Sequence, residues 1–299
     1  MKKYIVGIDL GGTKIVGGII NKEGELVGEP IKVPTLAEQS QERIEERLVH
    51  SIRSVIENTG ISFREIKGVG IGSPGPLDLK EGKILNPPNL PTLHNYPIRD
   101  RLRQILKLPV IVNNDGNCFV LGESYFGAAK DANIVFGVTL GTGFGSGVVI
   151  NRNIFVGATG TAAEIHYSPY LGKRFEDTGS AKGIMRIYRK LSGRELSPPQ
   201  IAERAKDGED KAIIAWEDYG KHLGIILSYE VNLLDPDIIV IGGSISKDYE
   251  LFKDSLENNL RENIVSPQRE NLKIAVSQLG ENTGFIGAAC LFFMSKSWR

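Results

Sequence analysis

The chain has 299 residues, of which 41% are hydrophobic and 24% charged, a composition typical of a soluble protein with room for two ordinary domains. Its 36 basic and 36 acidic residues cancel, so no charge excess indicates a nucleic-acid partner. Two cysteines do not make a disulfide framework, and no apolar run reaches the length of a membrane span. We therefore expect a cytoplasmic protein that binds neither nucleic acid nor membrane.

The first motif is a glycine turn between two short apolar runs near the N-terminus. One run ends on Asp9 and the next begins at Ile15, a pattern that predicts a β-hairpin. The turn between them consists of Gly11, Gly12, Thr13 and Lys14. Glycines let backbone N–H groups approach an anion closely, and the hydroxyl and ammonium groups add further donors. The turn is therefore a candidate phosphate loop with Asp9 as a candidate Mg²⁺ ligand, and an ordinary hairpin is the alternative.

A second copy of this motif lies 130 residues further along the chain. Segment 137–151 aligns without gaps on segment 7–21, and six of the fifteen positions are identical. Its turn, Gly141, Thr142 and Gly143, has neither the acid nor the lysine of the first. Internal similarity of this kind indicates a duplicated domain, each half with one phosphate hairpin. Two such loops would suit the phosphate chain of a nucleotide.

Between and after the hairpins, apolar periodicity predicts alternating strands and helices, which is the α/β class. Strands are expected at 66–71, 109–112, 238–241 and 272–277. Helices are expected at 35–58, 98–107, 118–126, 180–191, 209–234 and 280–293, with another opened by Pro198 and a loop at 172–179. We place the domain boundary near 113–116. This gives an N-terminal domain 1–113, completed by a C-terminal helix 285–299, and a larger C-terminal domain 114–284.

Three polar or glycine-rich turns follow predicted strands. They are Gly72-Ser73-Pro74-Gly75-Pro76, Asn113-Asn114-Asp115-Gly116 and Gly242-Gly243-Ser244. Ligands gather at strand ends in open α/β sheets, so the Asp115 carboxylate is a candidate catalytic group. The alternatives are plain strand-ending turns and, for Asp115, a turn that caps the following helix.

The DxGGTK pattern from Asp9 to Lys14, with a second glycine loop, resembles the actin/hexokinase/Hsp70 superfamily. Within it the chain resembles the ROK family of bacterial sugar kinases and repressors, over nearly its whole length. The resemblance implies duplicated ribonuclease H-like domains flanking a ligand cleft, an enzyme that uses ATP and Mg²⁺, and a homodimer.

The resemblance also implies a role for individual residues. Asp115 takes the place of the general base. The sugar contacts implied are Gly72, Ser73, Pro74, Asn89, Asn114, Asp115, Glu164, His166 and Glu176. The nucleotide contacts implied are the two phosphate loops and, on the adenosine side, Gly242 and Gly243. Solvated surface acids are the alternative for the two glutamates, and a packed histidine for His166.

The chain departs from the family pattern after Glu164. It is one residue short before the family's histidine, so His166 or Tyr167 fills that place. Many members follow with a CxCGxxGC zinc site, but no cysteine lies between Cys118 and Cys290. Without thiolates we expect no zinc site.

The function expected from these features is transfer of the γ-phosphoryl group of ATP to a hexose, with the 6-hydroxyl of glucose as the first choice. Fructose, mannose and N-acylated hexosamines stay open as acceptors, and polyphosphate as the donor. A sugar-sensing ROK regulator is the alternative of another class, although a phosphate loop at residue 9 leaves no room for a preceding helix-turn-helix. A nucleotide-driven assembly or chaperone protein is disfavoured by the sugar-type turns.

Overall fold

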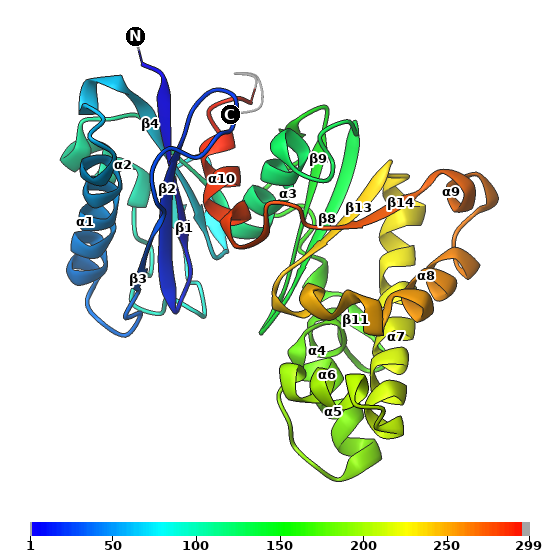
Figure 1. The fold of residues 1–299 in the computed structure, drawn as a ribbon. Helices are drawn as coiled ribbons and strands as arrows, with labels where there is room; N and C mark the ends of the chain where they lie inside the picture. The colour runs from blue at the N-terminus through cyan, green and yellow to red at the C-terminus, as the bar shows by residue number, and fades with distance from the viewer. Residues whose placement is uncertain (1, 295–299) are drawn as a thin grey trace. The chain divides into compact units, whose positions relative to one another are not determined.

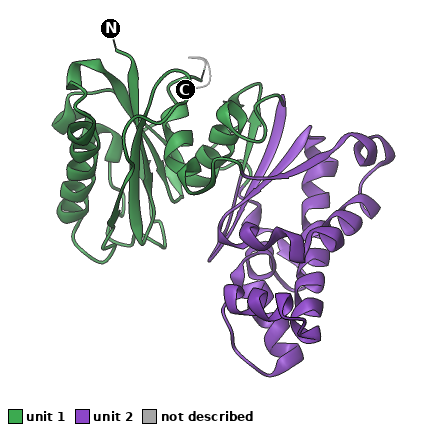
Figure 2. Ribbon diagram, in the orientation of Figure 1, with its two compact units in different colours: residues 1–131, 147–163, 278–299 green, residues 132–146, 164–277 purple. Residues whose placement is uncertain are grey.

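The computed structural model describes residues 2–294, which form an α/β protein (Figure 1). The chain divides into two compact units (Figure 2). Unit 1 consists of residues 1–131, 147–163 and 278–299, and unit 2 of residues 132–146 and 164–277. The chain thus passes between units at other residues than the boundary near 113–116 that the motifs suggested. Of the predicted C-terminal helix 285–299, residues 295–299 lie outside the described part.

The first sheet has five strands in the order β3-β2-β1-β4-β7. They are β1 (Tyr4–Leu10), β2 (Lys14–Ile20), β3 (Ile31–Pro34), β4 (Ile66–Ser73) and β7 (Val110–Asn114). The first three form an antiparallel meander, and β4 and β7 continue the sheet parallel to β1. The carboxyl ends of β1, β4 and β7 therefore share one edge of this sheet.

The second sheet repeats this arrangement with the order β10-β9-β8-β13-β14. Its strands are β8 (Ile134–Leu140), β9 (Phe144–Ile150), β10 (Asn153–Ile154), β13 (Ile238–Gly242) and β14 (Lys273–Val276). Here β8 takes the place of β1, and β13 lies parallel to it as β4 does to β1. The repeated strand order confirms the duplicated α/β fold predicted from the two hairpins.

The helices of unit 1 are α1 (Gln41–Thr59), α2 (Ile98–Leu106), α3 (Asp115–Phe126) and α10 (Thr283–Cys290). Helix α1 begins later than predicted because Ser40 caps it, its side chain accepting a hydrogen bond from the Arg43 amide. It ends at Gly60, whose φ of 69° suits a left-handed cap. The apolar stripe expected on one face is buried, namely Ile44, Leu48, Ile52, Val55 and Ile56.

The helices of unit 2 are α4 (Phe175–Gly179), α5 (Ala181–Ser192), α6 (Pro198–Lys206), α7 (Asp210–Leu234), α8 (Lys253–Glu262) and α9 (Ser266–Asn271). The loop predicted at 172–179 is wrong in part, because Phe175 is buried and anchors the single turn of α4.

Short strands lie at Leu77–Asp78 (β5), Lys83–Ile84 (β6), Pro169–Tyr170 (β11) and Lys173–Arg174 (β12). Single 3₁₀ segments lie at Phe63–Glu65, Ile165–Tyr167, Ser244–Leu251 and Gly280–Asn282.

Helix α10 packs in the interior of unit 1, on β1, β4 and α3. Phe285 and Cys290 are fully buried in it, and Cys118 faces the same core from α3. Both cysteines are free thiols, and burial raises the pKa of each. They are therefore small core residues rather than reactive groups.

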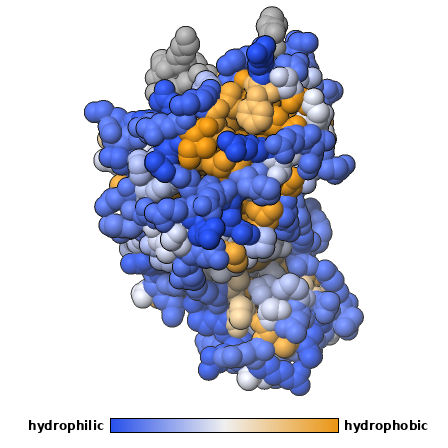
Figure 3. Space-filling view, turned by 90° about the vertical axis from the view of Figure 1, so that its left-hand side faces the viewer, coloured by the Kyte–Doolittle hydropathy of each residue, from blue (hydrophilic) through white to orange (hydrophobic). Residues whose placement is uncertain are grey.

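On the face drawn in Figure 3, the largest gathering of apolar residues lies near the top, and most of the remainder is polar. Within residues 2–294, no helix combines the length and the hydropathy that a membrane crossing requires.

Candidate functional site

The shared strand edge of unit 1 brings predicted site residues together. Asp9 at the end of β1 pairs in register with Gly72 of β4, and Ser73 pairs with Asn114 of β7. Asp115 follows as the first residue of α3, and a Cβ on Gly72 would lie 3.7 Å from its Cα. Carboxyl ends of parallel strands are where α/β sheets bind ligands. Two carboxylates therefore meet at the ligand-binding edge of this sheet.

The start of α3 separates the roles of two neighbouring side chains. Asn114 is the N-cap, and its Oδ1 accepts hydrogen bonds from the amides of Gly116 at 2.8 Å and Asn117 at 3.3 Å. Asn114 thus holds the N-cap position, while Asp115 Oδ1 also accepts a hydrogen bond from the Gly116 amide at 2.8 Å. Asp115 lies in the first helical turn, where the helix dipole stabilises a negative charge.

The pKa of the Asp9 carboxyl group is strongly raised. Burial, and secondly the nearby Asp115 carboxylate, raise its pKa to about 6, although Lys14 acts in the opposite direction. A Cβ on Gly284, near the start of α10, would lie 2.6 Å from Asp9 Oδ2. Mg²⁺ is held through one or two carboxylates together with substrate phosphates. The donor set at this edge, Asp9 with Asp115 near it, therefore fits a hard divalent cation.

The first phosphate loop is fixed by the residue that follows β3. The Gly11 amide donates to the Lys14 carbonyl at 2.9 Å, and the Thr35 hydroxyl donates to the Gly11 carbonyl at 2.6 Å. A Cβ on Gly12 would lie 2.5 Å from the Asn89 carbonyl oxygen, so the loop lies directly on Asn89. Asn89 was predicted as a sugar contact, and Thr35 was not predicted at all. Thr35 could have been found only from the tertiary contact.

The second phosphate loop has a comparable frame within unit 2. The Gly141 amide donates to the Gly143 carbonyl at 3.0 Å, and the Gly141 carbonyl accepts from the Ala181 amide at 2.8 Å. A Cβ on Gly141 would lie 3.5 Å from Ser244 Oγ, and Gly242 pairs in register with Thr139. The structure thus brings the second loop and the Gly242-Gly243-Ser244 turn together at neighbouring strand ends.

Glu176 lies beside this second loop. Its Oε2 would be 3.2 Å from a Cβ on Gly143, and its Oε1 accepts a hydrogen bond from Lys182 Nζ at 3.1 Å. Lys182 was missed by sequence reasoning, although one signal was available. It is a basic residue in the first turn of a helix, α5, where the helix dipole disfavours positive charge unless an anion lies near.

The remaining predicted sugar residues also have defined places. In unit 1, Ser73 and Pro74 are buried at the end of β4. In unit 2, Glu164 precedes the 3₁₀ turn Ile165–Tyr167, and its Oε2 lies 3.1 Å from His166 Nδ1. Tyr167 exposes 62% of its surface, whereas His166 is half-buried. Within residues 2–294, no group of three or more His, Cys, Asp or Glu side chains is arranged to hold a metal.

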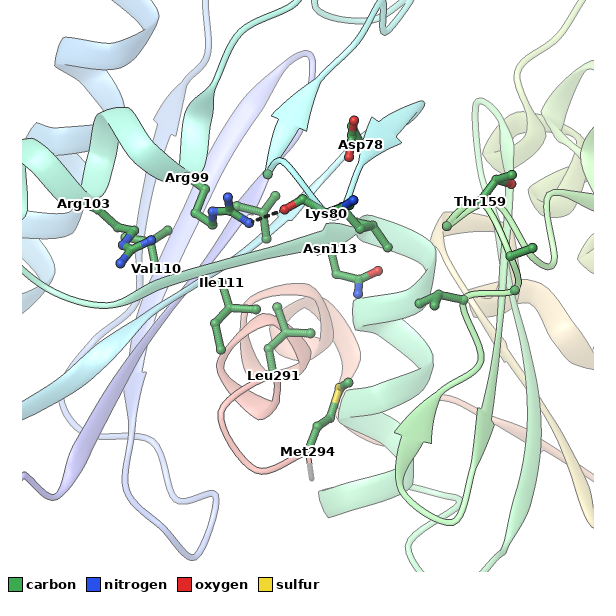
Figure 4. Close-up of a pocket in the computed structure, with 17 residues that line it drawn as sticks. Asp78, Lys80, Arg99, Arg103, Val110, Ile111, Asn113, Thr159, Leu291 and Met294 are labelled. Atoms are coloured by element: carbon green, nitrogen blue, oxygen red, sulfur yellow. Dashed lines mark hydrogen bonds between the residues drawn. The ribbon is translucent and has the colours of Figure 1, made fainter. Parts of the chain in front are cut away.

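A separate cavity of about 660 Å³ lies in unit 1 beside β7 (Figure 4). Its floor is apolar, with Ile111, Leu291 and Met294, and Arg99 and Arg103 of α2 lie at one side. No residue predicted from the sequence lines it. One lining residue does touch the site: Asn113 Oδ1 accepts from the Asn114 amide at 2.8 Å and from Asn117 Nδ2 at 3.0 Å, and so supports the turn before Asp115.

The chain is similar to known proteins over nearly its whole length. A sequence model of the ROK family matches residues 5–294. The chain is 29% identical over 314 residues to a glucokinase of Thermotoga maritima, with 97% of each chain covered. It is 27% identical over 310 residues to a xylose repressor of Caldicellulosiruptor bescii, covering 96% of this chain and 77% of the repressor.

Among solved structures, the chain matches a ROK family glucokinase from Streptomyces griseus in complex with glucose and AMPPNP. The TM-score is 0.82 at 27% identity, with 96% of this chain and 98% of that chain covered. The fold is thus the duplicated actin/hexokinase-like one. The repressor match shows that proteins of this fold and family include regulators as well as kinases.

Proposed function

The chain belongs to the ROK family, and from this membership we propose that it is an ATP-dependent hexose kinase. The observation that carries the proposal is the unit 1 edge, where Asp115, the residue after the N-cap Asn114, stands beside Asp9. The proposed acceptor is the 6-hydroxyl of glucose, which the glucokinase relatives support. Other hexoses would bind through the same types of contact.

In the proposed reaction, Asp115 accepts the proton of the sugar hydroxyl as the oxygen attacks the γ-phosphorus. The new sugar O–P bond forms, the bond from the γ-phosphorus to the bridging oxygen breaks, and ADP leaves with that electron pair. The backbone amides of Gly11–Lys14 and Gly141–Gly143 would bind the phosphate chain. Asp9 would hold Mg²⁺, which supplies charge neutralisation on the phosphates when bound.

The residues proposed to contact the sugar are those that the family resemblance implies. The proposed contacts in unit 1 are Gly72, Ser73, Pro74, Asn89 and Asn114, and those in unit 2 are Glu164, His166 and Glu176. Carboxylate and amide groups suit this task because each accepts or donates two hydrogen bonds at fixed angles. The adenosine end of the nucleotide would lie at Gly242 and Gly243. We propose that neither sugar binding nor phosphoryl transfer requires zinc, and that the enzyme acts as a homodimer.

A sugar-sensing regulator is the second candidate, favoured by the similarity to the xylose repressor. A coupled assay of ADP release over a panel of hexoses, with a parallel assay using polyphosphate, separates the two. We expect turnover with ATP and Mg²⁺, fastest with glucose. Calorimetric binding of a sugar without turnover from either donor would overturn the kinase and support the regulator.

A further inference from the structure

The second phosphate loop lacks charged groups of its own. In the alignment of the two hairpins, Thr139 stands where the first has Asp9, and Phe144 stands where it has Lys14. Phe144 is buried, and a Cβ on Gly179 would lie 2.7 Å from its ring. The residue of the second hairpin that aligns with Lys14 is thus part of the unit 2 core. A cation at this loop must come from elsewhere in the chain.

The structure supplies an acid and a lysine to this loop from two helices. Helix α5 is tied to the loop by the hydrogen bond from the Ala181 amide to the Gly141 carbonyl. Lys182 is the next residue, and its ammonium group donates to Glu176 Oε1 at 3.1 Å. The other carboxylate oxygen of Glu176 faces Gly143. The lysine and the acid therefore lie together at the turn that the hairpin leaves uncharged.

We propose that Lys182 is a phosphate-binding residue of the second loop, contacting the phosphate chain of the donor. The inference rests on the proposed kinase function and assigns to that site a residue outside the sequence motifs. It also explains the position of Glu176. A lone carboxylate against the loop would repel a phosphate. The Lys182 ammonium offsets that charge, and it can itself contact the phosphate.

The side chain of Lys182 is free to do this. It remains 56% exposed while paired, and its flexible four-carbon stem lets the ammonium turn from the carboxylate to an incoming anion. An ordinary surface ion pair, which contributes little to stability, is the competing explanation. The two explanations differ in what nucleotide binding does when the lysine is removed.

The test is calorimetric titration of the full chain with AMPPNP and excess Mg²⁺, without sugar, for the parent and Lys182→Met. Lys190→Met, near the other end of α5, is the matched control. We expect Lys182→Met to weaken binding about tenfold, or about 1.4 kcal/mol. Lys190→Met should bind as the parent does. Inorganic tripolyphosphate should compete with AMPPNP less well in Lys182→Met, which would place the contact on the phosphate chain.

Glu176→Gln sharpens the test. Since it removes a negative charge and frees Lys182, it should tighten AMPPNP binding or leave it unchanged, whereas a pair that only braces the loop predicts weaker binding in both variants. Equal AMPPNP affinity in the parent and a folded Lys182→Met protein would overturn the inference and leave the proposed function intact. A parent protein that binds no AMPPNP would overturn both.

Discussion

The two phosphate loops show what a duplicated hairpin keeps and what it does not. In both, the carbonyl of the same aligned glycine is anchored, Gly11 by the Thr35 hydroxyl and Gly141 by the Ala181 amide. The backbone frame is therefore common to the two. The charged groups are not, since the first loop has its own acid and lysine and the second has an acid and a lysine placed beside it by two helices. Backbone geometry repeats with the fold, while side-chain chemistry depends on each unit's neighbours.

The surroundings of the loops differ in stiffness as well. Gly12 faces the backbone carbonyl of Asn89, which cannot move without moving the chain. Gly143 faces the carboxylate of Glu176, at the end of a side chain that is 31% exposed. We therefore expect the first loop to tolerate change less well than the second.

The largest effect should come from Asp115, at the junction of β7 and α3 in unit 1. Asp115→Asn keeps the size and the hydrogen-bonding capacity but cannot accept a proton, so kcat should fall about 10²–10⁴-fold. The measurement is kcat at saturating sugar, ATP and Mg²⁺, with AMPPNP affinity by calorimetry as the control, which should hardly change. A kcat within a few-fold of the parent would remove Asp115 from the role of base.

The next effect should separate the loops directly. Gly12→Val and Gly143→Val both crowd the backbone donors of their loops. Gly12→Val should weaken AMPPNP binding more than Gly143→Val, because the Asn89 carbonyl is fixed in the chain whereas the Glu176 side chain can move aside. AMPPNP titration of each folded variant measures this. Unchanged affinity in Gly143→Val would remove the second loop from the nucleotide site.

A smaller effect should appear in stability as a function of pH. Because the pKa of Asp9 is raised from 3.8 to about 6, the folded protein holds that proton more tightly than the unfolded chain. The resulting stabilisation is complete below pH 3.8 and is lost as the pH rises through 6. Asp9→Asn, which is always neutral, should therefore be more stable than the parent at pH 7.5 by roughly 1–3 kcal/mol.

Thermal unfolding without nucleotide or Mg²⁺ tests this, with the exposed Asp131→Asn as a control. The gain of Asp9→Asn should shrink as the pH falls below 6, and a gain that is constant with pH would refute the assignment. In kinase assays the same variant should need more Mg²⁺, since it loses charge beside the metal rather than a proton acceptor.

The smallest effect, none, is expected from zinc removal. Because the chain has no cysteine between Cys118 and Cys290, strong zinc chelation with Mg²⁺ resupplied should leave Tm and activity unchanged. Elemental analysis should find well under one zinc per chain. A stoichiometric zinc that survives dialysis would contradict this.

The sequence predicted the parts of this molecule that depend on local pattern. The paired hairpins, the parallel strands after them and the apolar stripe of α1 follow from period and glycine turns. The predicted start of α3, Cys118, lies three residues after the observed start, Asp115. The helix begins earlier because Asn114 caps it. The turn α4 was missed because a five-residue helix has no readable period and depends on the burial of Phe175.

The candidate site was predictable only where a motif defines it. Asp9, the first loop and Asp115 occur in patterns with recognisable spacing. Thr35 and Asn113 support the site through contacts that no local pattern indicates, and for Lys182 the sequence offers only a basic residue in the first turn of a helix. For Glu176 the sequence left two possibilities, and the structure adds its position against Gly143.

The discontinuity of unit 1 has a consequence for how the protein is made. Helix α10, with Phe285 at its centre, belongs to the core formed by β1, β4 and α3, yet it is synthesised after all of unit 2. The core of unit 1 therefore cannot close before α10 has been synthesised. A chain truncated before residue 283 would leave exposed the parts of β1, β4 and α3 that α10 covers, and uncovered apolar surface of this kind is what chaperones bind.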